Sequence, residues 1–153
     1  MNAHVSNNKL HGNQNVFLIG PMGVGKTTIG KLLAKELGLQ FIDTDQEVER
    51  RAGADISWIF DVEGEAGFRI RETSVLDDLT QEPKVLLATG GGSILKPENR
   101  RYLCSRGVVV FLDTTVEMQL KRTEKDKKRP LLQQGNPKEI LTRLKAERDP
   151  IYQ

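Results

Sequence analysis

The sequence has little cysteine, little net charge and no long apolar run, and each shortage excludes a class of protein. Its one cysteine, Cys104, cannot form an internal disulfide, which fits a reducing compartment. The net charge of +2 gives no general reason to bind nucleic acid or a membrane surface. No segment approaches the roughly 18 apolar residues that a membrane-spanning helix needs. We therefore expect a cytoplasmic protein with no nucleic-acid partner and no membrane partner.

Residues 1–15 differ in composition from the rest of the chain, because they are rich in asparagine and contain no apolar core of a secretory signal. They include both histidines, His4 and His11, but nothing that would complete a metal site with them. We expect a flexible leader over 1–15. The remaining residues, 16–153, suffice for a single domain with one hydrophobic core.

Within that domain, apolar runs alternate with amphipathic segments, which is typical of a parallel α/β sheet. Short runs of apolar and β-branched residues predict four strands, at 16–19, 40–43, 84–88 and 107–112. Helical spacing and capping residues predict helices at 26–37, from Asp55 through Phe60, at 65–79, and from Thr114 and Asn136 onward. The sequence therefore predicts a three-layer α/β/α sandwich around a central parallel sheet.

The segment between the first strand and the first helix matches G-x-x-x-x-G-K-[ST] from Gly20 to Thr27. Glycines let consecutive backbone N–H groups point at one anion, and the helix start adds its positive dipole end. Lys26 can reach the β- and γ-phosphates, and the Thr27 hydroxyl can bind Mg²⁺. The predicted ATP-binding residues of this loop are Gly23, Val24, Gly25, Lys26, Thr27 and Thr28.

Polar and flexible residues follow the second and third strands. Asp43 and Asp45 could serve Mg²⁺ and a hydroxyl acceptor, because ligands of parallel sheets bind beyond the carboxyl ends of the strands. For either aspartate alone, a helix N-cap is an equal interpretation. Gly90-Gly91-Gly92 would let a ligand approach the backbone closely, or would form a plain turn.

Three basic features are unremarkable in isolation. Arg69, with Glu72 three residues on, is typical of a surface ion pair, and Arg148 has no distinctive context. The run from Lys121 to Arg129 carries six positive residues. Such a run is usually a solvated helix end. Beside a phosphate-binding loop it could instead be a mobile lid that closes over a triphosphate.

Taken in order, the motifs of this chain are more specific than any one of them. They are the loop at 20–27, Phe41-Ile42-Asp43-Thr44-Asp45, Phe68-Arg69 with Glu72, Thr89-Gly90-Gly91-Gly92, Arg129-Pro130-Leu131-Leu132, and Glu147-Arg148-Asp149-Pro150-Ile151-Tyr152. This ordered set resembles the shikimate kinase family, from about Val16 to Gln153. The resemblance implies a P-loop fold of the nucleoside-monophosphate-kinase type. It also implies transfer of the ATP γ-phosphate to the 3-hydroxyl of shikimate, which gives shikimate 3-phosphate and ADP in aromatic amino-acid biosynthesis.

The resemblance further implies roles for single residues. Lys26, Asp45 and Arg129 would be catalytic, with Lys26 and Arg129 at the transferring phosphoryl group and Asp45 at the acceptor hydroxyl. Thr27 would bind Mg²⁺ directly and Asp43 through water, while Arg122 would lie against the adenine. Helices over about 44–80 would bind the substrate, and about 121–136 would form the lid. The residues implied to bind shikimate are Asp45, Arg69, Gly90, Gly91, Gly92 and Arg148.

The chain departs from the family pattern at its end, since members usually continue with one more strand and a final helix after the equivalent of Tyr152. We expect the chain to be incomplete there, with a sheet of four strands and an uncovered edge. We expect a monomer. Two other functions remain open at this point: a P-loop kinase for another small acceptor, such as gluconate or a nucleoside monophosphate, and a non-catalytic nucleotide-binding protein.

Overall fold

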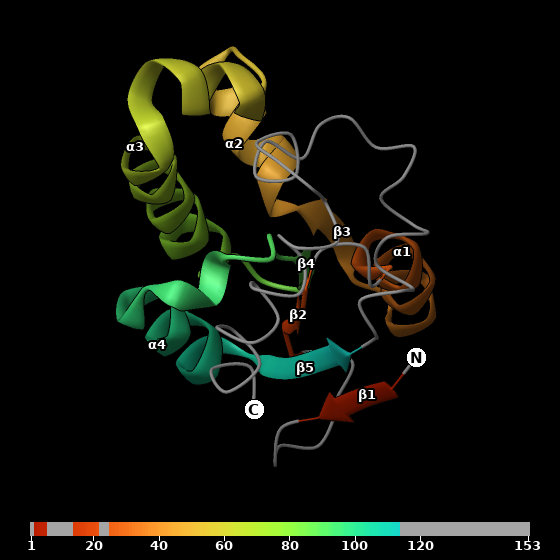
Figure 1. The fold of residues 1–153 in the computed structure, drawn as a ribbon. Coiled ribbons are helices and arrows are strands. Elements are labelled where there is room, and N and C mark those ends of the chain that lie inside the picture. The colour runs from red at the N-terminus through yellow and green to blue at the C-terminus, as the bar shows by residue number, and fades with distance from the viewer. Residues whose placement is uncertain (1, 6–13, 22–24, 114–153) are drawn as a thin grey trace.

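The computed structural model of the chain describes residues 2–5, 14–21 and 25–113 (Figure 1). The strands are β1 (Asn2–Val5), β2 (Val16–Ile19), β3 (Gln40–Asp43), β4 (Val85–Ala88) and β5 (Val108–Asp113). The helices are α1 (Lys26–Leu37), α2 (Thr44–Ala52), α3 (Ile56–Leu79) and α4 (Pro97–Arg106), with a short 3₁₀ turn η1 (Ser93–Leu95). The expected helices after Thr114 and Asn136 and the expected lid lie outside the described residues. Over the described ranges, no helix is long and apolar enough to cross a membrane.

The sheet has the strand order β1-β5-β2-β4-β3. The strands β5, β2, β4 and β3 run parallel, which confirms the predicted central parallel sheet. Residues 2–5 form β1, which pairs antiparallel with β5 from Asn2 opposite Asp113 to Val5 opposite Val110. Residues 2–5 are thus paired where we expected a flexible leader, and they cover an edge that we expected to be uncovered. The outer edge of β5 offers unpaired N–H and C=O groups, and β1 satisfies them.

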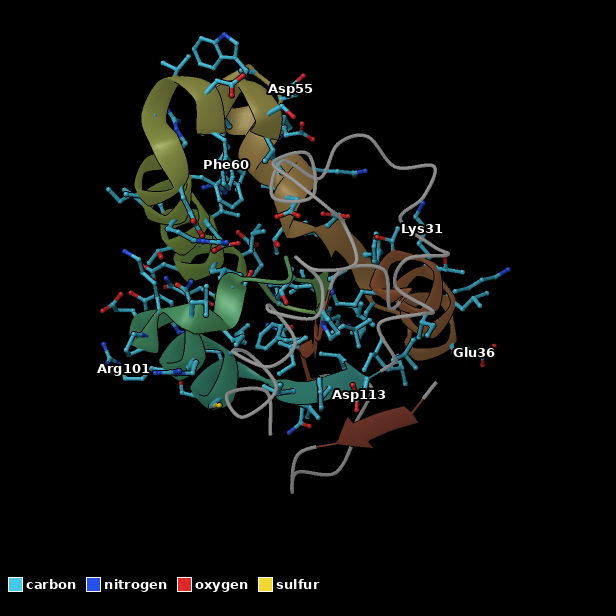
Figure 2. All side chains as sticks on the ribbon, viewed as in Figure 1. Lys31, Glu36, Asp55, Phe60, Arg101 and Asp113 are labelled. Atoms are coloured by element: carbon cyan, nitrogen blue, oxygen red, sulfur yellow. The ribbon has the colours of Figure 1, made fainter. Side chains whose placement is uncertain are left out.

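Two hydrophobic clusters cover the two faces of the sheet, as a three-layer sandwich requires. Successive residues of β2 alternate between them, with Phe17 in the larger cluster and Leu18 in the smaller. The larger cluster packs under α3 and α4, and the smaller one under α1. Figure 1 shows α1 on one side of the sheet and α3 with α4 on the other, and Figure 2 shows Lys31 and Glu36 on the outer side of α1.

Two strand boundaries differ slightly from the prediction. Strand β4 begins at Val85 rather than Lys84, because Lys84 has a φ of 54°, outside the extended region. Strand β5 runs from Val108 to Asp113 rather than from 107 to 112, since Gly107 ends α4. Strands β2 and β3 and helix α1 have the predicted bounds.

Helix α3 consists of two helical parts that meet at a kink, which confirms the two helices that the sequence predicted. Asp55 caps its start by accepting a hydrogen bond from the backbone N–H of Trp58 at 2.8 Å, as expected. Gly64 interrupts the helical backbone with φ 74° and ψ 176°. Arg71 bridges the interruption by donating two hydrogen bonds of 2.8 Å to Glu63. Trp58, the single tryptophan of the chain, lies before the kink and is half exposed.

Asn15 joins three segments at the end of the sheet where β2, β4 and β5 begin. Its side-chain amide donates to the carbonyl of Glu82 at 2.7 Å and accepts from the N–H of Val85 at 3.0 Å. Its backbone carbonyl accepts from the N–H of Val108 at 2.9 Å. Asn15, which the prediction assigned to the leader, therefore takes part in holding the sheet together.

Helix α2 carries an ion-pair cluster that makes a pH prediction possible. Arg50, helped by Arg51, holds the pKa of Glu47 at about 2, below the usual value of 4.5. A carboxylate with a lowered pKa in the folded state stabilises the fold above pH 4.5, and that contribution is lost as the pH falls toward 2. We expect Glu47→Gln to lower the free energy of unfolding at pH 7 by less than about 1 kcal/mol, because Arg50 is exposed and the pair is screened.

The measurement is urea unfolding of wild type and variant at pH 7, 4.5 and 3. The difference in free energy of unfolding between wild type and variant should be largest at pH 7 and smaller at pH 3. A difference that grew on acidification would contradict the assignment of the lowered pKa to Glu47.

Candidate active site

A pocket of about 320 Å³ lies at the carboxyl ends of β2, β3 and β4. The segment that follows each of these strands contributes to the walls of the pocket. This is the place where parallel sheets usually bind their ligands. The lining residues are Gly25, Lys26, Thr27, Thr28, Asp43, Asp45, Ala88, Thr89, Gly90 and Gly91. Three predicted groups, namely the phosphate-binding loop, the two aspartates and the glycine segment, therefore share one pocket.

The ammonium group of Lys26 folds back over its own loop. Its Nζ donates to the carbonyl oxygens of Gly20 at 2.6 Å and Pro21 at 2.9 Å. These contacts place a positive charge beside the start of α1, where the dipole and the first N–H groups of the helix also favour an anion. The site can accordingly bind a phosphate chain. Of the predicted ATP-binding residues, Gly23 and Val24 fall outside the described residues, as do Arg122 and Arg129.

Asp43 caps helix α2 with one carboxylate oxygen and faces the phosphate-binding loop with the other. Its Oδ1 caps α2 by accepting from the backbone N–H groups of Asp45 at 2.9 Å and Gln46 at 3.2 Å. Its Oδ2 accepts from the Thr27 hydroxyl at 3.3 Å. The cap fixes the orientation of the carboxylate and directs the second oxygen toward the phosphate-binding loop.

The donor set fits Mg²⁺, which prefers hard oxygen ligands such as the Thr27 hydroxyl and the Asp43 carboxylate. Within the described part of the chain, no three histidine, cysteine or acidic residues form a metal cage. Mg²⁺ usually keeps several waters and takes further ligands from substrate phosphates rather than from a cage of protein side chains.

Asp45 lies in the first turn of α2, against the glycine segment. A β-carbon on Gly90 would come within 2.7 Å of Asp45 Oδ1 and 3.2 Å of Glu72 Oε2. Only glycine therefore leaves room for both carboxylates at this wall. The lack of a side chain at Gly90 therefore allows the carboxylates of Asp45 and Glu72 to lie close to the backbone there.

Arg69 and Glu72 form a buried ion pair, and the sequence-based interpretation of a surface pair was wrong. The side chain of Arg69 is 10% exposed and that of Glu72 is 1% exposed. Arg69 Nη1 donates to Glu72 Oε1 at 3.0 Å. A β-carbon on Gly92 would overlap the guanidinium of Arg69, so the two residues are in direct contact. Arg69 thus lies beside the pocket, next to the end of the glycine segment.

Ser93 was not predicted from the sequence, and its hydroxyl donates to Glu72 Oε2 at 2.9 Å. Glu72 had no predicted role of its own and was part of a motif with Arg69. The one available signal was the i, i+3 spacing of Arg69 and Glu72, and this spacing is equally common on exposed helix faces. Arg148 lies outside the described residues, so the predicted second arginine of the site remains a prediction.

Known proteins resemble this chain over most of its length. A family model described as shikimate kinase matches residues 22–153. A shikimate kinase of Photobacterium profundum is 61% identical over 140 residues, which are 92% of this chain and 80% of that protein. A shikimate kinase of Psychrobacter arcticus is 61% identical over 137 residues, which are 90% of this chain and 74% of that protein.

Solved structures agree with the fold as well. The structure of shikimate kinase from Acinetobacter baumannii in complex with shikimate has a TM-score of 0.89 and 55% sequence identity, covering 91% of this chain and 78% of that one. Shikimate kinase from Aquifex aeolicus has a TM-score of 0.77 and 42% identity, covering 90% of this chain and 81% of that one.

Proposed function

This chain belongs to the shikimate kinase family and is an ATP-dependent kinase that acts on shikimate, and from that premise we propose how its residues carry out the transfer. The predicted shikimate kinase activity is thereby confirmed over the other acceptors and the non-catalytic protein that the sequence left open. We further propose that it transfers the γ-phosphate of ATP to the 3-hydroxyl of shikimate, in the cytoplasm, as a monomer.

One observation carries the residue assignments: a single pocket holds the phosphate-binding loop and the residues assigned to the acceptor. Lys26 and Thr27 line the same pocket of about 320 Å³ as Asp45 and Gly90. A phosphoryl donor and a hydroxyl acceptor can therefore meet there. Phosphoryl transfer needs positioning and charge neutralisation more than covalent chemistry by the protein.

At the donor side, Lys26 would leave its loop carbonyls for the β- and γ-phosphate oxygens of ATP. Thr27 would bind Mg²⁺ directly, and Asp43 Oδ2 would hold it through a water molecule. The ion would neutralise phosphate charge when bound. Arg129 would meet the transferring phosphoryl group and Arg122 the adenine, by resemblance to the family.

At the acceptor side, Asp45 would accept a hydrogen bond from the 3-hydroxyl and orient its oxygen toward the γ-phosphate. It would also be placed to accept the proton that this oxygen loses. Arg69 and Arg148 would bind the carboxylate of shikimate, since a guanidinium can bond both oxygens of one carboxylate. Backbone groups of Gly90, Gly91 and Gly92 would line the ring.

The direct test is ADP release by the purified chain with Mg²⁺ and ATP, in the presence and absence of shikimate. We expect release to depend strongly on shikimate and to stop when EDTA removes the metal. Release at the same rate without shikimate would refute the kinase assignment. Gluconate and a nucleoside monophosphate serve as control acceptors, and neither should replace shikimate.

We expect Arg69→Lys to raise the KM for shikimate by about tenfold to a hundredfold and to change kcat much less, because the lost contact is remote from the reacting atoms. Lysine keeps the charge but cannot offer two parallel N–H groups. Steady-state kinetics with varied shikimate measure the effect. Arg71→Lys is the matched control, since Arg71 lies two residues away on α3 and pairs with Glu63 instead. An unchanged KM for shikimate in Arg69→Lys would show that Arg69 does not bind the substrate.

A further inference from the structure

Ser93 connects the glycine segment to the buried ion pair of Arg69 and Glu72. It is fully buried at the start of η1. Its backbone N–H donates to the carbonyl of Gly90 at 3.1 Å, and its own carbonyl accepts from Asn99 Nδ2 of α4 at 2.8 Å. Its hydroxyl donates to Glu72 Oε2 of α3 at 2.9 Å. The glycine segment and α4 thus fix the backbone of Ser93, and its side chain faces the ion pair.

Glu72 divides its two carboxylate oxygens between Ser93 and Arg69. Oε1 accepts from Arg69 Nη1 at 3.0 Å, and Oε2 accepts from Ser93 Oγ. Because the Glu72 side chain is 1% exposed, water is poorly placed to replace a lost donor. Without the Ser93 hydroxyl, the guanidinium of Arg69, which already bonds Oε1, is a charged donor that Oε2 could share. The carboxylate would then turn to bind Arg69 through both of its oxygens.

Arg69 has one guanidinium edge left for a ligand. Glu72 occupies Nη1, and Nη2 donates to Glu65 at a longer 3.3 Å. The Glu65 side chain is half exposed, so a stronger ligand could displace it. The Nε group is buried and has no hydrogen-bond partner in the described ranges. Nε and Nη2 lie on the same edge of the guanidinium, where they can bond two carboxylate oxygens in parallel.

We propose that Ser93 is a positioning residue for the carboxylate of shikimate. Its hydroxyl donates a hydrogen bond to Glu72 Oε2, so Glu72 accepts from only one N–H group of Arg69. The Nε edge of the guanidinium is then available to bind the substrate. This inference rests on the proposed function, in which Arg69 binds that carboxylate. Ser93 itself touches neither substrate nor nucleotide in this account, and it acts through Glu72.

The first experiment measures steady-state kinetics of Ser93→Ala. We expect the KM for shikimate to rise by about tenfold, the loss typical of a hydrogen bond to a charged group. The kcat and the KM for ATP should stay within about twofold, because the phosphate-binding loop is untouched. Ser93→Thr keeps the hydroxyl and should restore most of the affinity for shikimate.

Thr80→Ala is the control for the simple loss of a buried hydroxyl. Thr80 is as deeply buried as Ser93, and its hydroxyl donates to the carbonyl of Leu76 at 2.6 Å near the end of α3. Thermal unfolding of both alanine variants compares their stabilities. Thr80→Ala should lose stability with no change in the KM for shikimate, whereas Ser93→Ala should change both.

A double-mutant cycle and a neutral ligand separate positioning from general damage. Adding Ser93→Ala to Arg69→Lys should raise the KM no further, because the guanidinium on which Ser93 acts is gone. Calorimetry with the methyl ester of shikimate should give the same Kd for wild type and Ser93→Ala, since the ester offers no carboxylate.

The possible outcomes distinguish this inference from the proposed function. A raised KM in Arg69→Lys together with a normal KM in Ser93→Ala would overturn the role of Ser93 alone. Equal losses of affinity for shikimate and its ester in Ser93→Ala would also overturn it. An unchanged KM in Arg69→Lys, or a wild-type chain that neither binds nor phosphorylates shikimate, would overturn both.

Discussion

Lys26→Met lowers kcat for shikimate phosphorylation by about a thousandfold if Lys26 stabilises charge on the transferring phosphoryl group, the largest effect that we expect from any single change. Methionine is close to lysine in length and retains the packing of the side chain. It cannot donate to phosphate oxygens or offset their charge. The loss should be in kcat more than in the KM for shikimate, because shikimate binds at the other side of the pocket.

The measurement is ADP release at saturating ATP and shikimate. Lys31→Met is the matched control, because Lys31 is an exposed lysine on the same helix, with its Nζ 5.9 Å from the centre of the Phe41 ring. Its kcat should equal that of wild type. A kcat in Lys26→Met within tenfold of wild type would show that the ammonium does not act on the reacting phosphoryl group.

Asp45→Asn should lower kcat by about a hundredfold, the second largest effect. Asparagine has nearly the same shape, so the close approach to Gly90 is preserved. The amide cannot take the proton of the acceptor hydroxyl and orients it less strongly than a carboxylate does. If Asp45 only orients the acceptor hydroxyl, the loss of kcat should be closer to tenfold. In a loose transition state, removal of the hydroxyl proton by a base contributes little to the rate.

The pH dependence of kcat separates these two roles of Asp45. A base gives a rate that falls on acidification in wild type and not in Asp45→Asn. Asp61→Asn changes an exposed aspartate of α3 and should have no effect. A kcat in Asp45→Asn equal to that of wild type would show that Asp45 has no role in the reaction.

Elements that depend on local sequence signals could be predicted to the residue. The run at 16–19 is apolar and β-branched, and it is followed by glycines, so β2 has no competing assignment. Helix α1 carries apolar residues at helical spacing and ends where Gly38 adopts a left-handed φ of 69°. The placing of Asp43 and Asp45 beside the phosphate-binding loop could also be predicted, because all three follow ends of parallel strands.

Features that depend on tertiary packing could not be predicted in the same way. Strand β1 forms by pairing with β5, which is more than a hundred residues away, and its own composition resembles that of a polar tail. The burial of Glu72 is set by η1 and α4 packing over α3, and nothing in the spacing of Arg69 and Glu72 distinguishes a buried pair from an exposed one. Helix α4 lacks a strong hydrophobic periodicity, so no helix was predicted over 97–106.

The kink at Gly64 divides α3 into an outer part, which precedes it, and an inner part, which follows it. The single tryptophan belongs to the outer part. Trp58 lies six residues before the kink, half exposed, whereas Arg69 and Glu72 lie beyond it. The intrinsic fluorescence of the protein is therefore dominated by one fluorophore on the outer part. A shift in its emission on addition of shikimate would be an optical signal from that part alone, and it can be followed in stopped flow without attaching a dye.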